Sequence, residues 1–173
     1  MKKFILSLSI LASFVSANPL EFKTLSSNFK QSVTSEEAKI EYTGNFIATR
    51  TNAFWHYESP NLKDIYFSFD RVVVIEPDLE QAIITTIKNT PNLTEILANA
   101  KPNKNGIYEA KFDDVTYKIE LKNELPHTIK YTDKLDNKVE ITLSGIQKDQ
   151  KVNEALLIPE IPQNFDIISQ WIF

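Results

Sequence analysis

The fold of this chain is decided by the stretch Arg50-Thr51-Asn52-Ala53-Phe54-Trp55-His56-Tyr57, which leads into Ile65-Tyr66-Phe67-Ser68-Phe69 and then Pro77-Asp78-Leu79-Glu80-Gln81. The first two pieces predict short strands that carry aromatic residues on both faces. A strand with one buried face alternates apolar and polar residues. Apolar residues on both faces therefore indicate that the second face is covered as well, by protein or by a ligand.

Residues 1–17 have the pattern of a cleavable export signal. Lys2 and Lys3 give a positive start, an apolar run extends from Phe4 to Val15, and Ser16-Ala17 supplies the small residues of a cleavage site. The run is too short for a membrane-spanning helix, which needs about 20 apolar residues. We therefore expect a signal peptide over 1–17 and a single soluble, exported domain over 18–173.

Composition excludes several classes of protein. The chain has 173 residues, a formal net charge of −4 at pH 7 and no cysteine. Because phosphate binding usually requires a dense basic patch, we expect no nucleic-acid partner. The lack of cysteine excludes disulfides and thiol chemistry, so a packed core alone must hold the exported domain together. We expect it to be a monomer.

No pattern of catalytic or metal-binding residues is found in the sequence. Three glycines provide neither a phosphate-binding loop nor a dinucleotide fingerprint, and no Gly-x-Ser-x-Gly motif is present. His56 and His127 lack the spacing of a helical zinc pair. Glu76, Asp78 and Glu80 offer too few oxygen ligands for a calcium loop and fit a solvated turn. We expect a non-enzymatic protein with no catalytic residues, no metal and no cofactor.

Hydrophobic periodicity predicts mainly β structure with two helices. Phe22, Leu25, Phe29 and Val33 fit one face of an amphipathic helix, and Thr90-Pro91 begins a second helix that extends to residue 100. The predicted strands cover residues 40–48, 53–58, 64–69, 72–76, 79–87, 107–112, 115–121, 125–131 and 139–144. The short turns between them favour antiparallel meander connections.

The two halves of the predicted sheet differ in character. The first half is apolar on both faces, whereas 117–121 and 139–143 alternate strictly and indicate one solvated face. A single curved antiparallel sheet satisfies both patterns. We predict an α+β fold, an open β half-barrel covered by the N-terminal helix and by the short helix at 90–100. The short helix is either a movable lid or a permanent cover of the core.

The order of motifs resembles the LolA family of periplasmic outer-membrane lipoprotein carriers. The resemblance rests on these residues, which span most of the chain: Phe29-x-Gln31-x-Val33, Tyr42-x-Gly44-x-Phe46, Arg50, Phe54-Trp55, Pro60, Pro77-Asp78-Leu79-Glu80-Gln81, Tyr131-x-Asp133 with Asn137, and Pro162-x-Asn164-Phe165-Asp166-Ile167-Ile168. Two positions depart from the family pattern. Thr51 replaces a proline after the arginine, and Asp70-Arg71 replaces an Asp-Gly turn.

The resemblance implies a carrier that shields the acyl chains of lipoproteins. Such a carrier accepts them from an inner-membrane ABC transporter and delivers them to an outer-membrane receptor or to the outer membrane itself. The resemblance also implies that Arg50 holds the ligand-free lid closed and that Phe54 helps transfer. The residues that we expect to line the lipid-binding cleft are Phe46, Phe54, Trp55, Phe67, Phe69, Leu93, Ile96 and Leu97.

Other interpretations of the same residues remain open. Each aromatic residue is also compatible with an ordinary core position, and Arg50 is compatible with a simple hairpin turn. At the level of function, the same half-barrel suits a periplasmic lipid-binding sensor or regulator that transfers no lipoprotein. A secreted hydrolase of unusual type is a further alternative, which would show turnover of ester or glycan substrates.

Overall fold

A computed structural model of the chain describes residues 18–87 and 93–172, so the expected signal peptide and the expected N-cap Thr90-Pro91 lie outside the described residues. The described part forms one 12-stranded sheet. The strands are β1 (Thr24–Thr34), β2 (Lys39–Thr49), β3 (Ala53–Ser59), β4 (Lys63–Phe67), β5 (Arg71–Glu76), β6 (Gln81–Ile87), β7 (Lys101–Pro102), β8 (Tyr108–Phe112), β9 (Val115–Lys122), β10 (Leu125–Thr132), β11 (Lys138–Lys148) and β12 (Asp166–Ile172). Helix α1 (Leu93–Asn99) and two 3-10 turns, η1 (Pro77–Leu79) and η2 (Glu154–Leu157), complete it.

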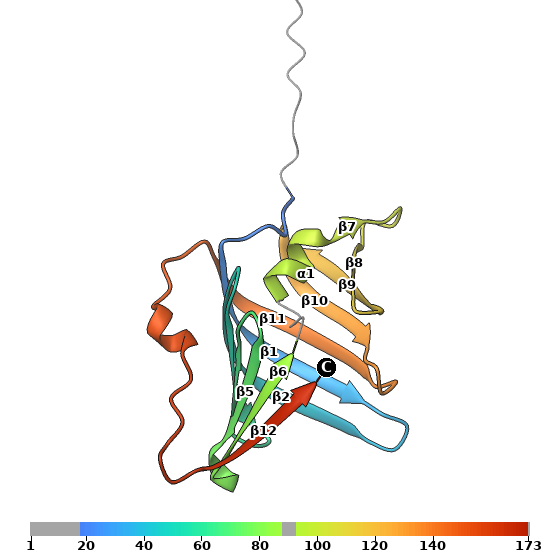
Figure 1. Ribbon diagram of the computed structural model, residues 1–173. Helices are drawn as coiled ribbons and strands as arrows, with labels where there is room; N and C mark the ends of the chain where they lie inside the picture. Colours follow the sequence, from blue (N-terminus) through green and yellow to red (C-terminus); the bar gives the residue numbers. More distant parts are fainter. Residues whose placement is uncertain (1–17, 88–92, 173) are drawn as a thin grey trace, which may run out of the picture.

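The sheet is an open, strongly curved meander, as predicted. Its strand order is β12-β6-β5-β4-β3-β2-β1-β11-β10-β9-β8-β7, and the two end strands do not pair with each other. All neighbours are antiparallel except β12, which pairs with β6 in parallel. Figure 1 shows α1 over the concave side of the curved sheet. No sequence pattern predicts β12, because its residues stand out only as part of a family motif.

The predicted N-terminal helix over residues 22–33 is wrong, because this segment forms strand β1. Leu25, Phe29 and Val33 are four residues apart, and a spacing of four fits the period of a strand as well as that of a helix. The intervening residues decide between them. The segment from Thr24 to Thr34 is rich in Ser, Thr and Asn, which are poor helix formers. The half-barrel is therefore covered by α1 alone among the described helices.

An aromatic cluster fills the concave side of the sheet. Phe46 is 1% exposed and stacks on Trp55, with 4.6 Å between ring centroids. Phe29 packs edge-on against Trp55 at 5.1 Å and against Tyr57 at 5.0 Å. Because inward side chains alternate along each strand, β1 brings Phe29, β2 brings Phe46 and β3 brings Trp55 and Tyr57 to the same face. This cluster forms the centre of the main hydrophobic core.

Protein covers the convex face of the first half of the sheet. Val73, Ile75 and Ala82 are buried there, together with half-buried Tyr66. The C-terminal segment supplies the cover, because Ile161 and Phe165 pack on this cluster and η2 contacts β3. In Figure 1 this segment, orange to red, runs along the outside of the green strands. The second apolar face noted in the sequence is thus occupied by the chain itself.

Two family motifs meet at the lower end of this face. The predicted turn at Pro77-Asp78 is confirmed as η1, and the strand begins at Gln81 rather than at Leu79. Glu80 has a φ of 49°, and its carbonyl oxygen accepts a hydrogen bond from the backbone N–H of Asp166 at 2.9 Å. The motif after Pro77 and the motif after Pro162 therefore act together to start the parallel pair β6–β12.

Helix α1 is held mainly by apolar contacts. Leu93, Ile96 and Leu97 are buried on the side that faces the sheet. Leu20 and Phe22, from the segment before β1, are buried in the same core. In the part of the chain that the structure describes, no helix has the length and apolar character needed to cross a membrane.

Two tyrosines of the concave side, Tyr57 and Tyr131, are half-buried against the core. Burial raises the pKa of Tyr131 to about 12 and also raises the pKa of Tyr57. A tyrosine in an unfolded chain ionises near pH 10. Ionisation above pH 10 therefore favours the unfolded chain, so the stability contributed by these neutral phenols is complete below about pH 10 and is lost as the pH rises towards 12.

We predict that the free energy of unfolding falls between pH 10 and pH 12 and that Tyr131→Phe makes this fall less steep. The reason is that phenylalanine keeps the ring but has no proton to lose. Urea titrations of both proteins across this range measure the slopes, and phenolate absorbance follows the ionisation. Equal slopes for the two proteins would contradict the assigned burial of Tyr131.

Candidate functional site

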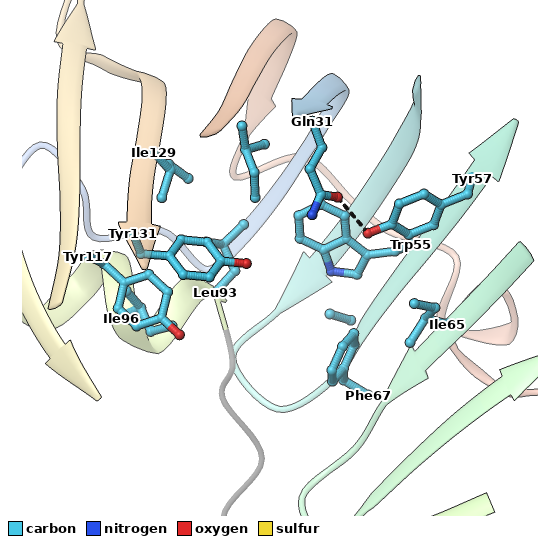
Figure 2. A pocket seen from close by; sticks show the side chains of 12 residues that line it. Gln31, Trp55, Tyr57, Ile65, Phe67, Leu93, Ile96, Tyr117, Ile129 and Tyr131 are labelled. Atoms are coloured by element: carbon cyan, nitrogen blue, oxygen red, sulfur yellow. Dashed lines mark hydrogen bonds between the residues drawn. The ribbon is translucent and has the colours of Figure 1, made fainter. Parts of the chain in front are cut away.

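A cavity of about 150 Å³ lies on the concave side of the sheet, beneath α1. Its lining is almost entirely apolar and aromatic. The lining residues are Gln31, Ala53, Trp55, Tyr57, Ile65, Phe67, Leu93, Ile96, Tyr117, Ile129, Tyr131 and Ile141. Figure 2 shows these side chains converging from opposite walls.

Alternation of side chains along the strands determines which residues line each wall of the cavity. On one wall, Ala53, Trp55 and Tyr57 of β3 point inward, and β4 adds Ile65 and Phe67 in register with them. The opposite wall comes from β9, β10 and β11, which contribute Tyr117, Ile129, Tyr131 and Ile141. Leu93 and Ile96 of α1 close one end. The curvature of the sheet brings the two walls to face each other, although they are far apart in sequence.

A few polar groups stand within this apolar lining. The Tyr57 hydroxyl donates a hydrogen bond to Gln31 Oε1 at 2.9 Å. On the other wall, the rings of Tyr117 and Tyr131 lie 4.8 Å apart. Burial also raises the pKa of Tyr117, to which the negative charge of Asp113 adds. These tyrosines are therefore neutral at physiological pH and present hydroxyl groups, not charges, to the cavity.

The size of the cavity limits what it holds in this conformation. Ligand pockets in proteins usually measure about 300–1,000 Å³, whereas a dry cavity of about 150 Å³ accommodates a molecule as small as benzene. At about 150 Å³ the present cavity lies below the range of ligand pockets and matches the small dry cavity. A long acyl chain therefore needs more room than the cavity offers in this conformation, in which Leu93 and Ile96 of α1 form part of the lining.

The structure separates the residues that the sequence had grouped as cleft residues. Trp55, Phe67, Leu93 and Ile96 line the cavity. Phe46 lies behind Trp55 in the core, and Leu97 is fully buried in the same core.

Phe54 and Phe69 lie elsewhere, which corrects their expected place in the cleft. Phe54 alternates with Trp55 along β3 and therefore lies on the convex face, where it stacks on Tyr66 at 4.7 Å. Phe69 is 86% exposed in the turn between β4 and β5, because β4 ends at Phe67 and not at residue 69 as predicted.

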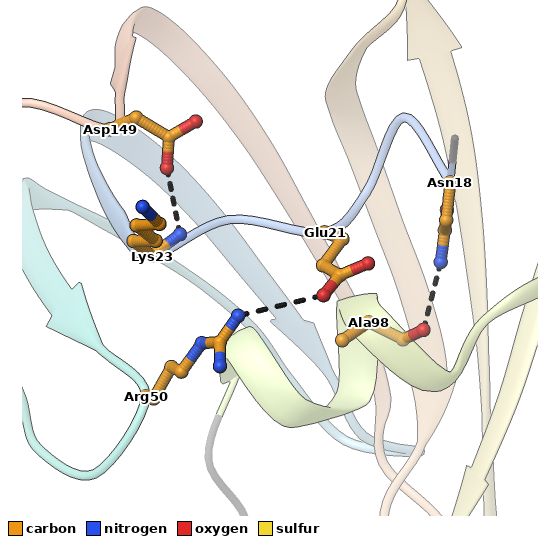
Figure 3. A network of polar contacts seen from close by, with 6 residues as sticks. All are labelled: Asn18, Glu21, Lys23, Arg50, Ala98 and Asp149. Atoms are coloured by element: carbon orange, nitrogen blue, oxygen red, sulfur yellow. Dashed lines mark hydrogen bonds and ion pairs between the residues drawn. The ribbon is translucent and has the colours of Figure 1, made fainter.

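Arg50 lies in the turn between β2 and β3, next to the exposed side of α1. Its guanidinium Nη2 is 3.5 Å from Glu21 Oε1, and both side chains are well exposed. Arg50 and Glu21 border a surface groove together with Thr94, Glu95 and Ala98 of α1. Figure 3 shows that the segment before β1 and the β2–β3 turn meet at the helix.

The described residues hold no cluster of side chains that would bind a metal ion. Among residues 18–87 and 93–172, no three His, Asp or Glu side chains gather as a metal ion would require. His56 Nδ1 lies 2.6 Å from Asp64 Oδ1 on the convex face, away from the cavity. His127 Nδ1 lies 3.2 Å from the carbonyl oxygen of Leu143. Each histidine thus has a local structural partner.

Sequence reasoning missed the second wall of the cavity. Tyr117 and Ile141 lie in the alternating segments 117–121 and 139–143, which had indicated only that one face of this half is solvated. Ile129 and Tyr131 lie on β10, between these strands. The alternation could have identified them, since every second residue of a strand lies on the same face. Gln31 was not recognised as a lining residue because residues 22–33 were predicted to form a helix and not a strand.

Comparison with known proteins identifies relatives of the whole chain. The profile of the family described as "Outer membrane lipoprotein carrier protein LolA" matches residues 21–105. An "Outer-membrane lipoprotein carrier protein" of Campylobacter jejuni is 38% identical over 97% of this chain and 99% of its own length. Proteins of the same name are 37% identical in Wolinella succinogenes, over 83% of this chain and 86% of the relative, and 33% identical in Helicobacter pylori, over 86% and 81%.

A solved structure shares the fold at low sequence identity. It is that of an uncharacterized conserved protein from Thermus thermophilus, with a TM-score of 0.52 and 10% identity, covering 88% of this chain and 93% of the other. At this identity the likeness concerns the fold alone. The sequence relatives, in contrast, align with nearly the whole chain, and on this basis the protein belongs to the LolA family of outer-membrane lipoprotein carrier proteins.

Proposed function

We propose that this protein is a non-enzymatic carrier that shields the acyl chains of lipoproteins while they cross the periplasm to the outer membrane. The observation that carries the proposal is the aromatic-lined cavity beneath α1, in a chain whose full-length relatives are named as lipoprotein carriers. The exported form begins near residue 18, after removal of residues 1–17.

The energetics explain why a carrier is needed. Burial of an acyl chain is worth about 0.8 kcal/mol per CH₂, so each long chain left in water costs on the order of 10 kcal/mol. A carrier has to cover the chains and yet release them. A shallow site with large aromatic surfaces suits this task, because buried area need not become high affinity.

Loading requires α1 to move away from the sheet. Besides its apolar face, α1 is held by local hydrogen bonds. Thr94 Oγ1 donates to the carbonyl oxygen of Thr49 at 2.7 Å, and Asn18 Nδ2 donates to the carbonyl oxygen of Ala98 at 2.8 Å. A bound acyl chain replaces the apolar contacts of Leu93 and Ile96 when the helix lifts, so the helix serves as the lid of the cavity.

Arg50 is proposed to favour the closed, ligand-free position of this lid. Its ion pair with Glu21 joins the β2–β3 turn to the segment that crosses α1, at the groove formed with Thr94 and Glu95. Exposed ion pairs contribute only about 0.2–1 kcal/mol. An interaction of this size biases the lid position without locking it. Thr51, in place of the family's proline, forms part of the same turn.

The partners follow from the direction of transport. We propose that an inner-membrane lipoprotein-releasing ABC transporter loads the carrier and that an outer-membrane receptor, or the outer membrane itself, unloads it. The carrier needs no nucleotide of its own, so the direction of transfer comes from these partners. In this proposal it acts as a monomer.

The carrier function predicts that the protein binds acylated peptides and makes lipoproteins soluble. The exported protein, added to spheroplasts without detergent, is expected to release lipoproteins into the soluble fraction. Mass spectrometry of protein purified from periplasmic extract is expected to find acylated peptides bound to it. If neither appears, while the protein remains folded by circular dichroism, the carrier function is refuted.

We predict that Arg50→Leu leaves the protein folded and able to load but slows unloading by up to about fivefold, the factor that corresponds to an exposed ion pair. The reason is that unloading ends in the closed state, which this change makes less favourable. Transfer of a loaded lipoprotein to outer-membrane vesicles measures the rate. Arg71→Leu, an exposed arginine at the start of β5, is the matched control. An unchanged rate in Arg50→Leu removes Arg50 from the mechanism.

A further inference from the structure

Three polar side chains face one another inside the apolar cavity, and we call them the polar cluster: Gln31, Tyr57 and Tyr131. They come from β1, β3 and β10, on opposite sides of the cavity. Figure 2 shows the Tyr131 hydroxyl directed towards the side where the Gln31 amide and the Tyr57 hydroxyl lie. Shielding of hydrocarbon requires none of these polar atoms, since phenylalanine and leucine of similar size would cover it equally well.

Two hydrogen-bond donors of the polar cluster, the Gln31 NH₂ group and the Tyr131 hydroxyl, are left over after the bond between Tyr57 and Gln31. The Tyr57 hydroxyl donates to Gln31 Oε1 at 2.9 Å, which orients the Gln31 amide so that its NH₂ group faces the cavity. Among residues 18–87 and 93–172, no acceptor is found for this NH₂ group or for the Tyr131 hydroxyl. Donors buried without acceptors are unfavourable. The missing partner should therefore be a group that accepts hydrogen bonds.

The tyrosines of the polar cluster are protonated, so their hydroxyl groups can donate hydrogen bonds. Burial raises the pKa of Tyr57 and Tyr131, and the proximity of Tyr131 raises the pKa of Tyr57 further. Both phenols therefore keep their protons at physiological pH. The Tyr131 hydroxyl and the Gln31 NH₂ group therefore offer neutral donors to the cavity, while Ile65, Phe67 and Ile129 contribute apolar surface to its lining.

We propose that the polar cluster binds the carbonyl oxygens at the head of the acyl groups, with Gln31 Nε2 and the Tyr131 hydroxyl as donors. This inference rests on the proposed carrier function. An ester carbonyl is an acceptor only, and it stands at the junction between the polar head and the hydrocarbon chain. Its binding at the cluster sets how deeply the chains enter the cavity. The site consequently prefers acyl chains to alkyl chains of equal length.

The test compares two synthetic lipopeptides that differ only at the linkage. One is a dipalmitoyl-S-glyceryl-cysteine peptide with two ester groups, and the other is its dialkyl ether analogue. Fluorescence anisotropy of a labelled peptide gives the dissociation constants for the full-length exported protein. We expect the ester compound to bind about 3- to 10-fold more tightly, which is the factor expected for one hydrogen bond.

Variants assign this preference to the polar cluster. Tyr131→Phe and Gln31→Leu are expected to weaken binding of the ester compound and to leave binding of the ether compound unchanged. Tyr66→Phe removes a hydroxyl from the convex face and is the matched control, for which the full preference is expected. As a readout independent of affinity, the stretching frequency of a ¹³C-labelled ester carbonyl should fall on binding to the wild type and fall less in Tyr131→Phe.

The outcomes distinguish this inference from the carrier function. If the wild type binds both lipopeptides equally well, or if Tyr131→Phe and Gln31→Leu keep the full preference, the carbonyl site is overturned and the carrier function stands. If neither lipopeptide binds to the folded protein, the carrier function fails, and the carbonyl site fails with it.

Discussion

The structure depends on the need to cover both faces of strands β3 and β4. Large apolar side chains alternate there, so that Trp55 and Phe67 face one side while Phe54 and Tyr66 face the other. On the convex side, Ile161 and Phe165 of the C-terminal segment cover these residues. On the concave side the cover is α1, and it leaves a cavity of about 150 Å³. The two faces thus have different covers, one fixed and one proposed to move.

This difference gives the proposed function its physical basis. The convex cover begins at Asp149, which bonds to the backbone of Lys23 and Thr24, and it ends in β12 paired along β6. The described part of helix α1 has seven residues, and its hydrogen bonds include one from Thr94 to the end of β2 and one from Asn18, in the segment before β1, to Ala98. A short element held mainly by apolar surface is suited to exchange with an apolar ligand, because the ligand replaces those same contacts. The polar cluster then gives the exposed cavity a chemical preference.

Much of the fold was predictable because local patterns and tertiary structure agreed. In the second half, residues 117–121 and 139–143 alternate strictly. Strands β8, β9 and β10 end within one residue of the predicted limits, whereas β11 continues to Lys148 and not to residue 144 as predicted. The exceptions have identifiable causes. In β1 a spacing of four residues fits both a helix and a strand, and only the pairing with β2 and β11 selects the strand. The pairing of β12 with β6 is long-range, and no local pattern encodes it. For the site, the sequence showed that Phe54 and Trp55 are important but not which face each one takes, since that depends on the register of β3.

The central claim is that acyl chains occupy the concave cavity beneath α1 and not the convex apolar face. Photocrosslinking tests it most directly, with a lipoprotein whose acyl chain ends in a photoactivatable group and with crosslinked residues identified by mass spectrometry. The account predicts crosslinks to Ile96, Ile129 and Ile141, which converge on the cavity from α1, β10 and β11. Crosslinks confined to Phe54, Tyr66 or Phe69 would contradict it.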